Sequence, residues 1–250
     1  MKNNFKRFDT QNYEFNTQSK YGVYIIHGFS SSTYETKQLA EFLGNQGFHT
    51  ITKNLPGHGV SARECNNVKY SDWLYSVKQD VAKLVSESKK TYIIGCSMGG
   101  SIALYISSLF PINGCIVGGT VLKFKNPFTI NVTNRLFCKI IRLKKKSDIN
   151  KNQTIKFYGY TEYPLIALNE FRKMNLKIIK KLVKIKCPML IIHSKSDRLS
   201  LIENVNMIYN KIDSEIKEKF FVDKAHHNLF DSNPDQKNIF NKILSFIKEN

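Results

Sequence analysis

The chain has 250 residues, of which 42% are hydrophobic and 23% charged, a composition typical of a globular protein and too apolar for intrinsic disorder. Its formal net charge of +18 raises the hypothesis of a nucleic-acid or anionic-membrane partner. The lysines are scattered, however, and no known nucleic-acid-binding motif accompanies them, so we expect no nucleic-acid partner.

Signals for membrane insertion, export and metal binding are weak. No window approaches the roughly 20 apolar residues of a membrane span, and the basic residues 1–7 lack the apolar core of a secretory signal. The five cysteines are an odd set without C-x-x-C spacing, which favours free thiols over a disulfide framework or a zinc site. We therefore expect a single cytoplasmic domain, residues 1–250.

The first half of the chain alternates predicted strands with predicted helices. A polar arm at residues 1–19 is expected to include an edge strand, and apolar runs predict strands at 21–26, 48–54, 91–96 and 113–118. Helical periodicity predicts helices that end at Gly47, span 71–87 and span 101–110. This alternation is typical of a mostly parallel α/β sheet.

Residues 121–163 interrupt the alternation. They contain aromatic residues, a basic cluster at Arg142–Lys146 and no clear strand. The alternation then resumes, with predicted helices at 164–183, 203–212 and 234–248 and strands at 188–193 and 219–223. We expect one insertion after the fourth strand, and a ligand site at the carboxyl ends of the strands.

The segment 92–100, YIIGCSMGG, carries the strongest chemical signal. It places a G-x-S-x-G pattern between an apolar strand and a helix, so that Ser97 is predicted to lie on a sharp turn with its hydroxyl exposed. The start of the helix favours negative charge there, which suits a nucleophile that passes through an oxyanion. Cys96, beside the serine, is the weaker alternative as a nucleophile because it points toward the sheet.

A serine nucleophile needs a base and a group that orients the base. Asp197 follows one late predicted strand, and His227 follows the last, which gives the chain order Ser, Asp, His. His226 is the alternative base. Asp223 and Asp231 are the competing acids, and we expect them to be solvated or capping charges.

An oxyanion hole requires two backbone N–H donors. We expect one from Met98, the residue after the nucleophile, and the other from Phe29, in the loop that follows the first predicted strand. Gly28 would let that loop approach the serine closely.

These residues resemble the α/β-hydrolase superfamily, and more narrowly its small-capped bacterial carboxylesterases close to monoacylglycerol lipases. The likeness covers nearly the whole chain from Tyr21 onward. It rests on IHGF at 26–29, PGHGV at 56–60, SDW at 71–73, GCSMGG at 95–100, YPL at 163–165, IKCP at 185–188, Asp197, IYN at 208–210 and His227. The resemblance implies a catalytic triad of Ser97, Asp197 and His227. The sequence departs from the family at His226, where glycine is usual, and at Cys96, where leucine is more common.

The resemblance also implies a fold and a reaction. The fold would be that of the α/β hydrolases, a mostly parallel central sheet flanked by helices, with residues 121–163 as a small cap inserted after the strand that follows the nucleophile helix. The reaction would be hydrolysis of short- to medium-chain carboxylic esters, monoacylglycerols among them, without a metal or an organic cofactor. Substrate contacts are expected from His27, Gly28, Phe124, Phe128 and Phe137, although the aromatic residues could equally form the packing of the cap itself.

Other functions stay open at this point. The same motif would serve a thioesterase, a lactonase or another acyl-transfer or lyase reaction, and a chain without activity could use the pocket to bind an apolar ligand. The basic cluster at Arg142–Lys146 could contact an anionic membrane, but a solvated charged surface is the more common outcome, and we expect the latter.

Overall fold

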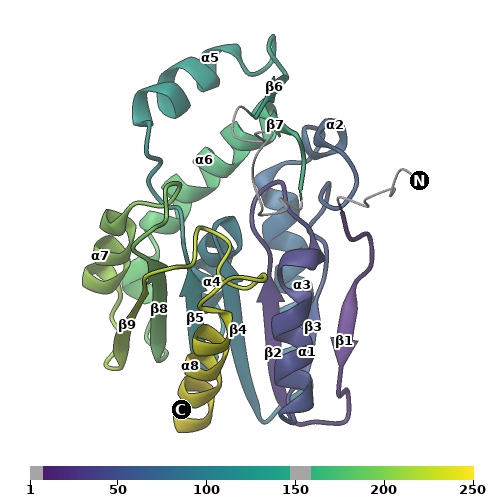
Figure 1. Ribbon diagram of the computed structural model, residues 1–250, viewed down its shortest axis with the longest axis vertical. Coiled ribbons are helices and arrows are strands. Elements are labelled where there is room, and N and C mark those ends of the chain that lie inside the picture. The colour runs from purple at the N-terminus through teal and green to yellow at the C-terminus, as the bar shows by residue number, and fades with distance from the viewer. Residues whose placement is uncertain (1–7, 147–158) are drawn as a thin grey trace.

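Seven strands form the central sheet of the computed structural model, which describes residues 8–146 and 159–250 (Figure 1). Their order across the sheet is β1-β3-β2-β4-β5-β8-β9. The strands are β1 (Tyr13–Phe15), β2 (Tyr21–Ile26), β3 (His49–Thr52), β4 (Lys90–Cys96), β5 (Gly114–Gly118), β8 (Met189–Ser194) and β9 (Lys217–Val222). β1 pairs antiparallel with β3 at one edge, and every other neighbouring pair of strands in this sheet is parallel. The predicted α/β class is confirmed.

The middle strands are apolar over most of their length because both faces of the sheet are covered. In β2, for example, Val23 and Ile25 pack into the hydrophobic cluster on one face, whereas Tyr24 and Ile26 pack into the cluster on the other. Continuous apolar runs, rather than runs that alternate with polar residues, are the expected pattern for such strands.

Helices form a layer on each face of the sheet (Figure 1). One layer contains α1 (Lys37–Asn45) and α8 (Gln236–Glu249). The other contains α3 (Tyr70–Glu87), α4 (Met98–Ser107), α6 (Leu165–Ile179) and α7 (Ile202–Lys211). Two short helices, α2 (Ala62–Cys65) and η3 (Leu182–Lys184), lie in connections. None of the helices within residues 8–146 and 159–250 is long and apolar enough to cross a membrane.

The first predicted helix is divided in two. A 3₁₀ turn, η1 (Thr33–Glu35), begins after the N-cap residue Ser32 and is followed by α1. Between them Thr36 is fully buried, and its hydroxyl shares a hydrogen bond of 2.6 Å with the hydroxyl of Thr52 in β3. This contact holds η1 against the sheet and leaves Glu35 buried below the end of β2.

The insertion at 121–163 has more structure than expected. It contains a helical stretch, η2 (Thr129–Asn134) and α5 (Arg135–Phe137), and β6 (Leu143–Lys145) pairs antiparallel with β7 (Glu162–Pro164). The expectation of no clear strand was wrong here, because each strand has three residues and finds its partner far along the chain, so neither leaves a local pattern. In Figure 1 the insertion lies above the sheet, at the top of the view.

A buried asparagine ties the insertion to the body of the fold. The Asn66 side chain, at the end of α2, donates to the Arg142 carbonyl at 2.8 Å and accepts from the N–H groups of Ile166 and Ala167 at 3.0 and 3.1 Å. A second tie joins the Tyr160 N–H to the Ser30 carbonyl at 3.0 Å. The insertion is therefore fastened to the body of the fold at Arg142 and at Tyr160.

Candidate active site

Ser97 occupies the sharp turn between β4 and α4. Its φ of 53° lies in the left-handed region, which is costly for a residue with a side chain. The Ser97 N–H donates to the Gly118 carbonyl of β5 at 2.8 Å, which helps to hold the strained backbone. The hydroxyl group lies at the start of α4, as the G-x-S-x-G pattern predicts.

Glycines at 95 and 99 make this turn sterically possible. A Cβ atom on Gly95 would lie 2.2 Å from the Gly99 carbonyl oxygen, and a Cβ on Gly99 would lie 2.2 Å from the Ile26 carbonyl oxygen. No side chain fits at either distance. The absence of side chains therefore allows α4 to begin directly against the ends of β2 and β4.

His227 connects Ser97 to Asp197 through two hydrogen bonds. Its Nε2 atom lies 2.9 Å from the Ser97 hydroxyl oxygen, and its Nδ1 atom lies 2.8 Å from Oδ2 of Asp197. A carboxylate can only accept, so Nδ1 carries the proton, and Nε2 accepts from the serine. The neighbouring His226 is exposed and takes no part in this arrangement. The structure thus brings together the three residues that the sequence analysis selected.

Asp197 is held by its own loop as well as by His227. Its Oδ1 atom accepts hydrogen bonds from the N–H groups of Leu199 and Ser200 at 2.8 and 3.0 Å. Burial by itself would raise the pKa of Asp197, but the hydrogen bond and charge of His227, together with the two N–H donors, lower it below its usual value. The carboxylate is therefore ionised near neutral pH.

The pKa of His227 is shifted in the opposite direction to that of Asp197. Burial alone would lower the pKa of His227, but the hydrogen bond to Asp197 and the charges of Asp197 and Glu35 outweigh it, so that the pKa is raised above 6.5. Such a site favours the imidazolium form more than water does. A base of this kind can accept a proton from a serine hydroxyl.

His27 lies beneath the loop that carries Phe29. It is fully buried; Nδ1 donates to the Gly28 carbonyl at 2.8 Å, and Nε2 accepts from the Leu55 N–H at 3.0 Å. Burial lowers its pKa, which keeps the ring neutral. Both ring nitrogens are thus used by the backbone, and His27 supports the loop rather than facing a ligand.

Two backbone N–H groups, those of Phe29 and Met98, are the expected oxyanion donors. Within the described part of the chain, neither the Phe29 N–H nor the Met98 N–H donates to a protein acceptor. A Cβ atom on Gly28 would lie 3.1 Å from the Ser97 Cβ, so the loop passes close to the serine, as expected. The expectation that these two N–H groups serve as oxyanion donors therefore stays a prediction.

The aromatic residues predicted to contact substrate are placed differently from one another. Phe124 is half-buried and packs edge-on against Phe171 of α6 with ring centroids 5.2 Å apart. Phe171 in turn lies 5.7 Å from Phe29. Phe128 and Phe137 are instead 71% and 47% exposed, on the outer surface of the insertion. Phe171 was not singled out from the sequence, since it reads as one of the apolar positions of a helix.

Glu35 was also missed. It is 5% exposed, and its Oε2 atom accepts a hydrogen bond of 2.6 Å from the Gly28 N–H. In the sequence it reads as an acidic residue in the first turn of a helix, where such residues are common. No sequence signal distinguishes it from an exposed helix-start acid.

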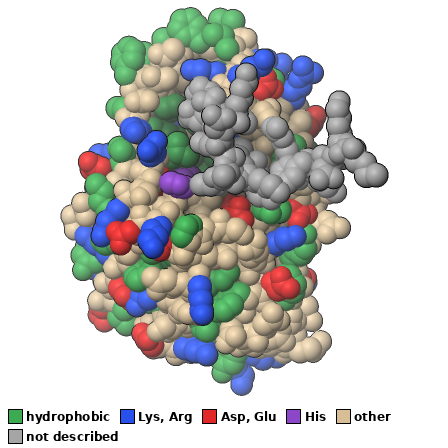
Figure 2. All heavy atoms as spheres, in the orientation of Figure 1, with side chains coloured by type: hydrophobic (Ala, Val, Ile, Leu, Met, Phe, Trp, Pro, Cys, Tyr) green, Lys and Arg blue, Asp and Glu red, His purple; other side chains and the backbone are tan. Residues whose placement is uncertain are grey.

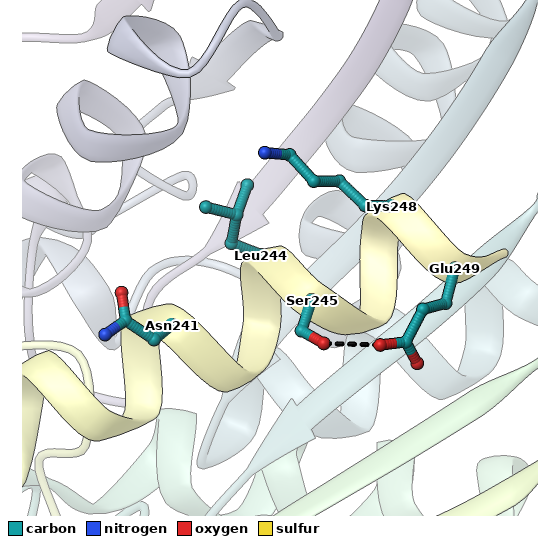
Figure 3. A pocket seen from close by; sticks show the side chains of 5 residues that line it. All are labelled: Asn241, Leu244, Ser245, Lys248 and Glu249. Carbon is teal, nitrogen blue, oxygen red and sulfur yellow. Dashed lines mark hydrogen bonds between the residues drawn. The ribbon is translucent and has the colours of Figure 1, made fainter.

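Within residues 8–146 and 159–250, no group of three or more His, Cys, Asp and Glu side chains is arranged to hold a metal ion. A surface hollow follows α8 and is lined by Asn241, Leu244, Ser245, Lys248 and Glu249 (Figure 3). In it the Ser245 hydroxyl donates to Glu249 at 2.5 Å. The end of α8 lies at the bottom of Figure 1, opposite the insertion, so this hollow is unrelated to the Ser97 site.

Comparisons with known proteins identify related chains. A family model described as "Serine aminopeptidase, S33" matches residues 17–234. A thermostable monoacylglycerol lipase of Bacillus sp. (strain H-257) is 25% identical over 223 residues, which cover 82% of each chain. A carboxylesterase of Bacillus subtilis (strain 168) is 22% identical over 208 residues, or 82% of this chain and 83% of the relative.

The fold is shared with solved lipolytic enzymes. A structure from work on the metagenome-derived enzymes LipS and LipT covers 96% of this chain and 98% of its own, with a TM-score of 0.87 and 24% sequence identity. The expected α/β-hydrolase fold is confirmed, and the chain is an esterase- or lipase-like α/β hydrolase.

The His227–Asp197 contact gives a prediction for proton affinity. Changing Asp197→Asn removes the charge that raises the pKa of His227 and leaves the burial that lowers it. We expect an imidazole titration by ¹⁵N NMR to give a lower pKa for His227 in the variant than in the unaltered protein, although the charge of Glu35 remains in both. His58, whose pKa burial lowers to about 3, should remain neutral in both proteins and serves as the internal control. Equal values for His227 in the two proteins would contradict the assignment.

Proposed function

Since the chain belongs to the serine aminopeptidase S33 family, we propose that it is a serine carboxylesterase that hydrolyses short- to medium-chain carboxylic esters, monoacylglycerols among them. One observation carries the proposal: the Ser97 hydroxyl, the His227 ring and the Asp197 carboxylate form a continuous hydrogen-bonded series at a strained strand-to-helix turn. This is the arrangement that activates a serine for acyl transfer.

In the first half of the reaction, Nε2 of His227 takes the proton from Ser97 as its oxygen attacks the ester carbonyl carbon. The carbonyl oxygen becomes an oxyanion that accepts hydrogen bonds from the N–H groups of Phe29 and Met98. His227 then gives its proton to the departing alkoxide, and the acyl group stays on Ser97. Asp197 remains ionised and stabilises the imidazolium throughout.

In the second half, a water molecule takes the place of the alcohol. His227 removes a proton from this water as it attacks the acyl carbon, and the same two N–H groups hold the second oxyanion. The Ser97 oxygen leaves with the proton returned by His227. A carboxylic acid is released and the starting state is restored.

The aromatic side chains of Phe29, Phe124 and Phe171 support an apolar acyl group as the substrate. They form a continuous series from the loop beside Ser97 to the insertion. The named relatives act on monoacylglycerols and carboxylic esters, which have such groups. Thioesters and lactones present the same reacting carbonyl, so activity toward them is the second candidate.

The nucleophile assignment is tested by Ser97→Ala. Removing the hydroxyl removes the attacking atom, and we expect the rate of p-nitrophenyl butyrate hydrolysis to fall by roughly 10⁴- to 10⁶-fold. The variant should also lose labelling by a fluorophosphonate probe while retaining its circular dichroism spectrum. Ser108→Ala, at the C-cap of the same helix, is the matched control and should react normally. An unaltered protein that is folded but unlabelled would instead favour a binding protein without activity.

The substrate class is tested by comparing leaving groups and chain lengths. We expect p-nitrophenyl esters of short and medium chains, and monoacylglycerols, to be cleaved faster than an aminoacyl p-nitroanilide, because an ester expels a better leaving group than an amide. A rate maximum at one chain length would report the depth of the acyl pocket. Faster cleavage of the anilide would make the chain an aminopeptidase and overturn the proposal.

The outer surface of the insertion favours substrates held in lipid aggregates. Six of its apolar side chains are exposed: Phe128, Val132, Leu136, Phe137, Ile140 and Ile141. Figure 2 shows hydrophobic side chains gathered at the top of the molecule, where Figure 1 places α5, with basic side chains below them. Residues 121–146 contain no Asp or Glu, and across the β6–β7 pair Glu162 lies opposite Lys145. This surface supports the membrane alternative that the sequence alone disfavoured.

We expect the protein to co-sediment with vesicles that contain phosphatidylglycerol, and less with vesicles of phosphatidylcholine alone. The double change Phe128→Ser and Ile140→Ser should weaken vesicle binding several-fold, because it removes apolar side chains that would be buried in the lipid. The double change Lys144→Gln and Lys145→Gln should remove the preference for anionic lipid.

Two exposed lysines of α3 provide the matched control for charge. Lys78→Gln with Lys83→Gln lowers the net charge by the same amount and should leave vesicle binding unchanged. An equal loss of vesicle binding in the two double lysine variants would mean that only the overall charge of the protein attracts it to the vesicles. None of these changes should alter hydrolysis of a dissolved short-chain ester.

A further inference from the structure

A second carboxylate, besides Asp197, lies under the candidate site. Glu35 ends the 3₁₀ turn η1 and is almost completely buried, and its Oε2 atom accepts the Gly28 N–H at 2.6 Å. Burial of an ionisable carboxyl group is costly unless it is compensated by hydrogen bonds or by charge. This cost suggests that the position has a use beyond packing.

The position of Glu35 relative to the nucleophile is set by Gly28. A Cβ atom on Gly28 would lie 3.2 Å from Oε2 of Glu35 and 3.1 Å from the Ser97 Cβ. A single backbone residue therefore separates the carboxylate from the nucleophile. The next residue along the chain is Phe29, whose N–H is the proposed oxyanion donor.

The peptide groups around Gly28 are fixed from two sides. Nδ1 of His27 donates to the Gly28 carbonyl, and the Leu55 N–H holds the other nitrogen of that ring. Glu35 holds the Gly28 N–H on the opposite side of the residue. The His27 contacts orient the peptide that ends in the Phe29 N–H, and the Glu35 contact prevents the residue before it from rotating away.

Other ionisable groups near Glu35 and His227 define its electrostatic surroundings. Burial and the Glu35 charge raise the pKa of the Cys96 thiol, which therefore remains protonated. Burial raises the pKa of Asp231 to about 6, and Glu35 adds to the effect. At His227 the charges of Asp197 and Glu35 act in the same direction. His193, near the end of β8, has its pKa lowered by burial and, to a smaller extent, by the charge of His227.

We propose that Glu35 is a positioning residue, which holds the Gly28–Phe29 loop in place for the oxyanion and adds negative charge beneath the His227 imidazolium. The inference rests on the proposed serine-hydrolase function. Glu35 itself does not touch the substrate; it acts through the Gly28 N–H and through its charge.

Two substitutions separate these contributions. Glu35→Gln retains an oxygen that can accept from Gly28 but removes the charge, so the acid limb of kcat/KM should shift to lower pH because His227 loses a charge that favours its protonated form. Glu35→Leu removes the acceptor as well. We expect its kcat to fall by about 10- to 100-fold with little change in KM, less than the 10²–10³-fold loss of a whole oxyanion donor.

Asp231→Asn is the matched control, since it neutralises a second buried carboxyl group that does not contact Gly28 and keeps the oxygen that accepts from the Ser232 N–H. It should leave kcat and the acid limb in place. An acid limb that does not move in Glu35→Gln, or a kcat within twofold of the unaltered protein in folded Glu35→Leu, would overturn the proposal, and so would a change confined to KM.

A measurement without substrate separates this inference from the proposed function. The NMR titration of His227 should give a lower pKa in Glu35→Gln than in the unaltered protein, whether or not the chain hydrolyses a given ester. If the unaltered protein hydrolyses none of the substrates and the titration still shifts, the proposed reaction fails but the electrostatic role of Glu35 stands. If the esters are hydrolysed and the titration does not shift, the role of Glu35 fails.

Discussion

The close approach of α4 to the sheet is the constraint on which the candidate site depends. Gly99 lies so near the Ile26 carbonyl that a side chain would collide with it. This contact places the first turn of α4 beside the end of β2, and so brings the serine, the Met98 N–H and the loop after β2 into one small volume. Each group comes from a different segment, and their distances are set by backbone packing rather than by flexible side chains.

Acidic side chains are buried around the candidate site, although the net charge of the protein is strongly positive. The carboxylates of Asp197, Glu35 and Asp231 all lie at or below the same end of the sheet, and each accepts hydrogen bonds from backbone N–H groups. Backbone donors are fixed dipoles that need no rearrangement when a proton moves. The imidazole of His227 is therefore placed where a positive charge is stabilised, while the basic side chains lie outside, on the surface.

Most of the sheet and the order of the reacting residues could be predicted from the sequence, because both leave local signals. Buried parallel strands are continuous apolar runs, and G-x-S-x-G marks a strand-to-helix turn wherever it occurs. The pair β6 and β7 could not be predicted, since three-residue strands have no periodicity and their pairing is nonlocal. Glu35 was missed for a related reason. Its turn is held against the sheet by the contact of Thr36 with Thr52 in β3, and the sequence of η1 gives no sign of this nonlocal contact. The sequence could not separate His226 from His227 geometrically, whereas the structure places only the latter beside Ser97.

The contacts of Asn66 affect which sequence changes the insertion can tolerate. All three partners of its side chain are backbone groups, of Arg142, Ile166 and Ala167. Only Arg142 of the three lies in the insertion, so this contact places no demand on the side chain at 142, whereas the side chains of Lys146 and Tyr160 bind Ser30 and Gly57 directly. A substitution at 142 can therefore alter the surface of the insertion while this contact with Asn66 persists. The same construction would let related chains explore different acyl groups without first having to refold the part that performs the chemistry.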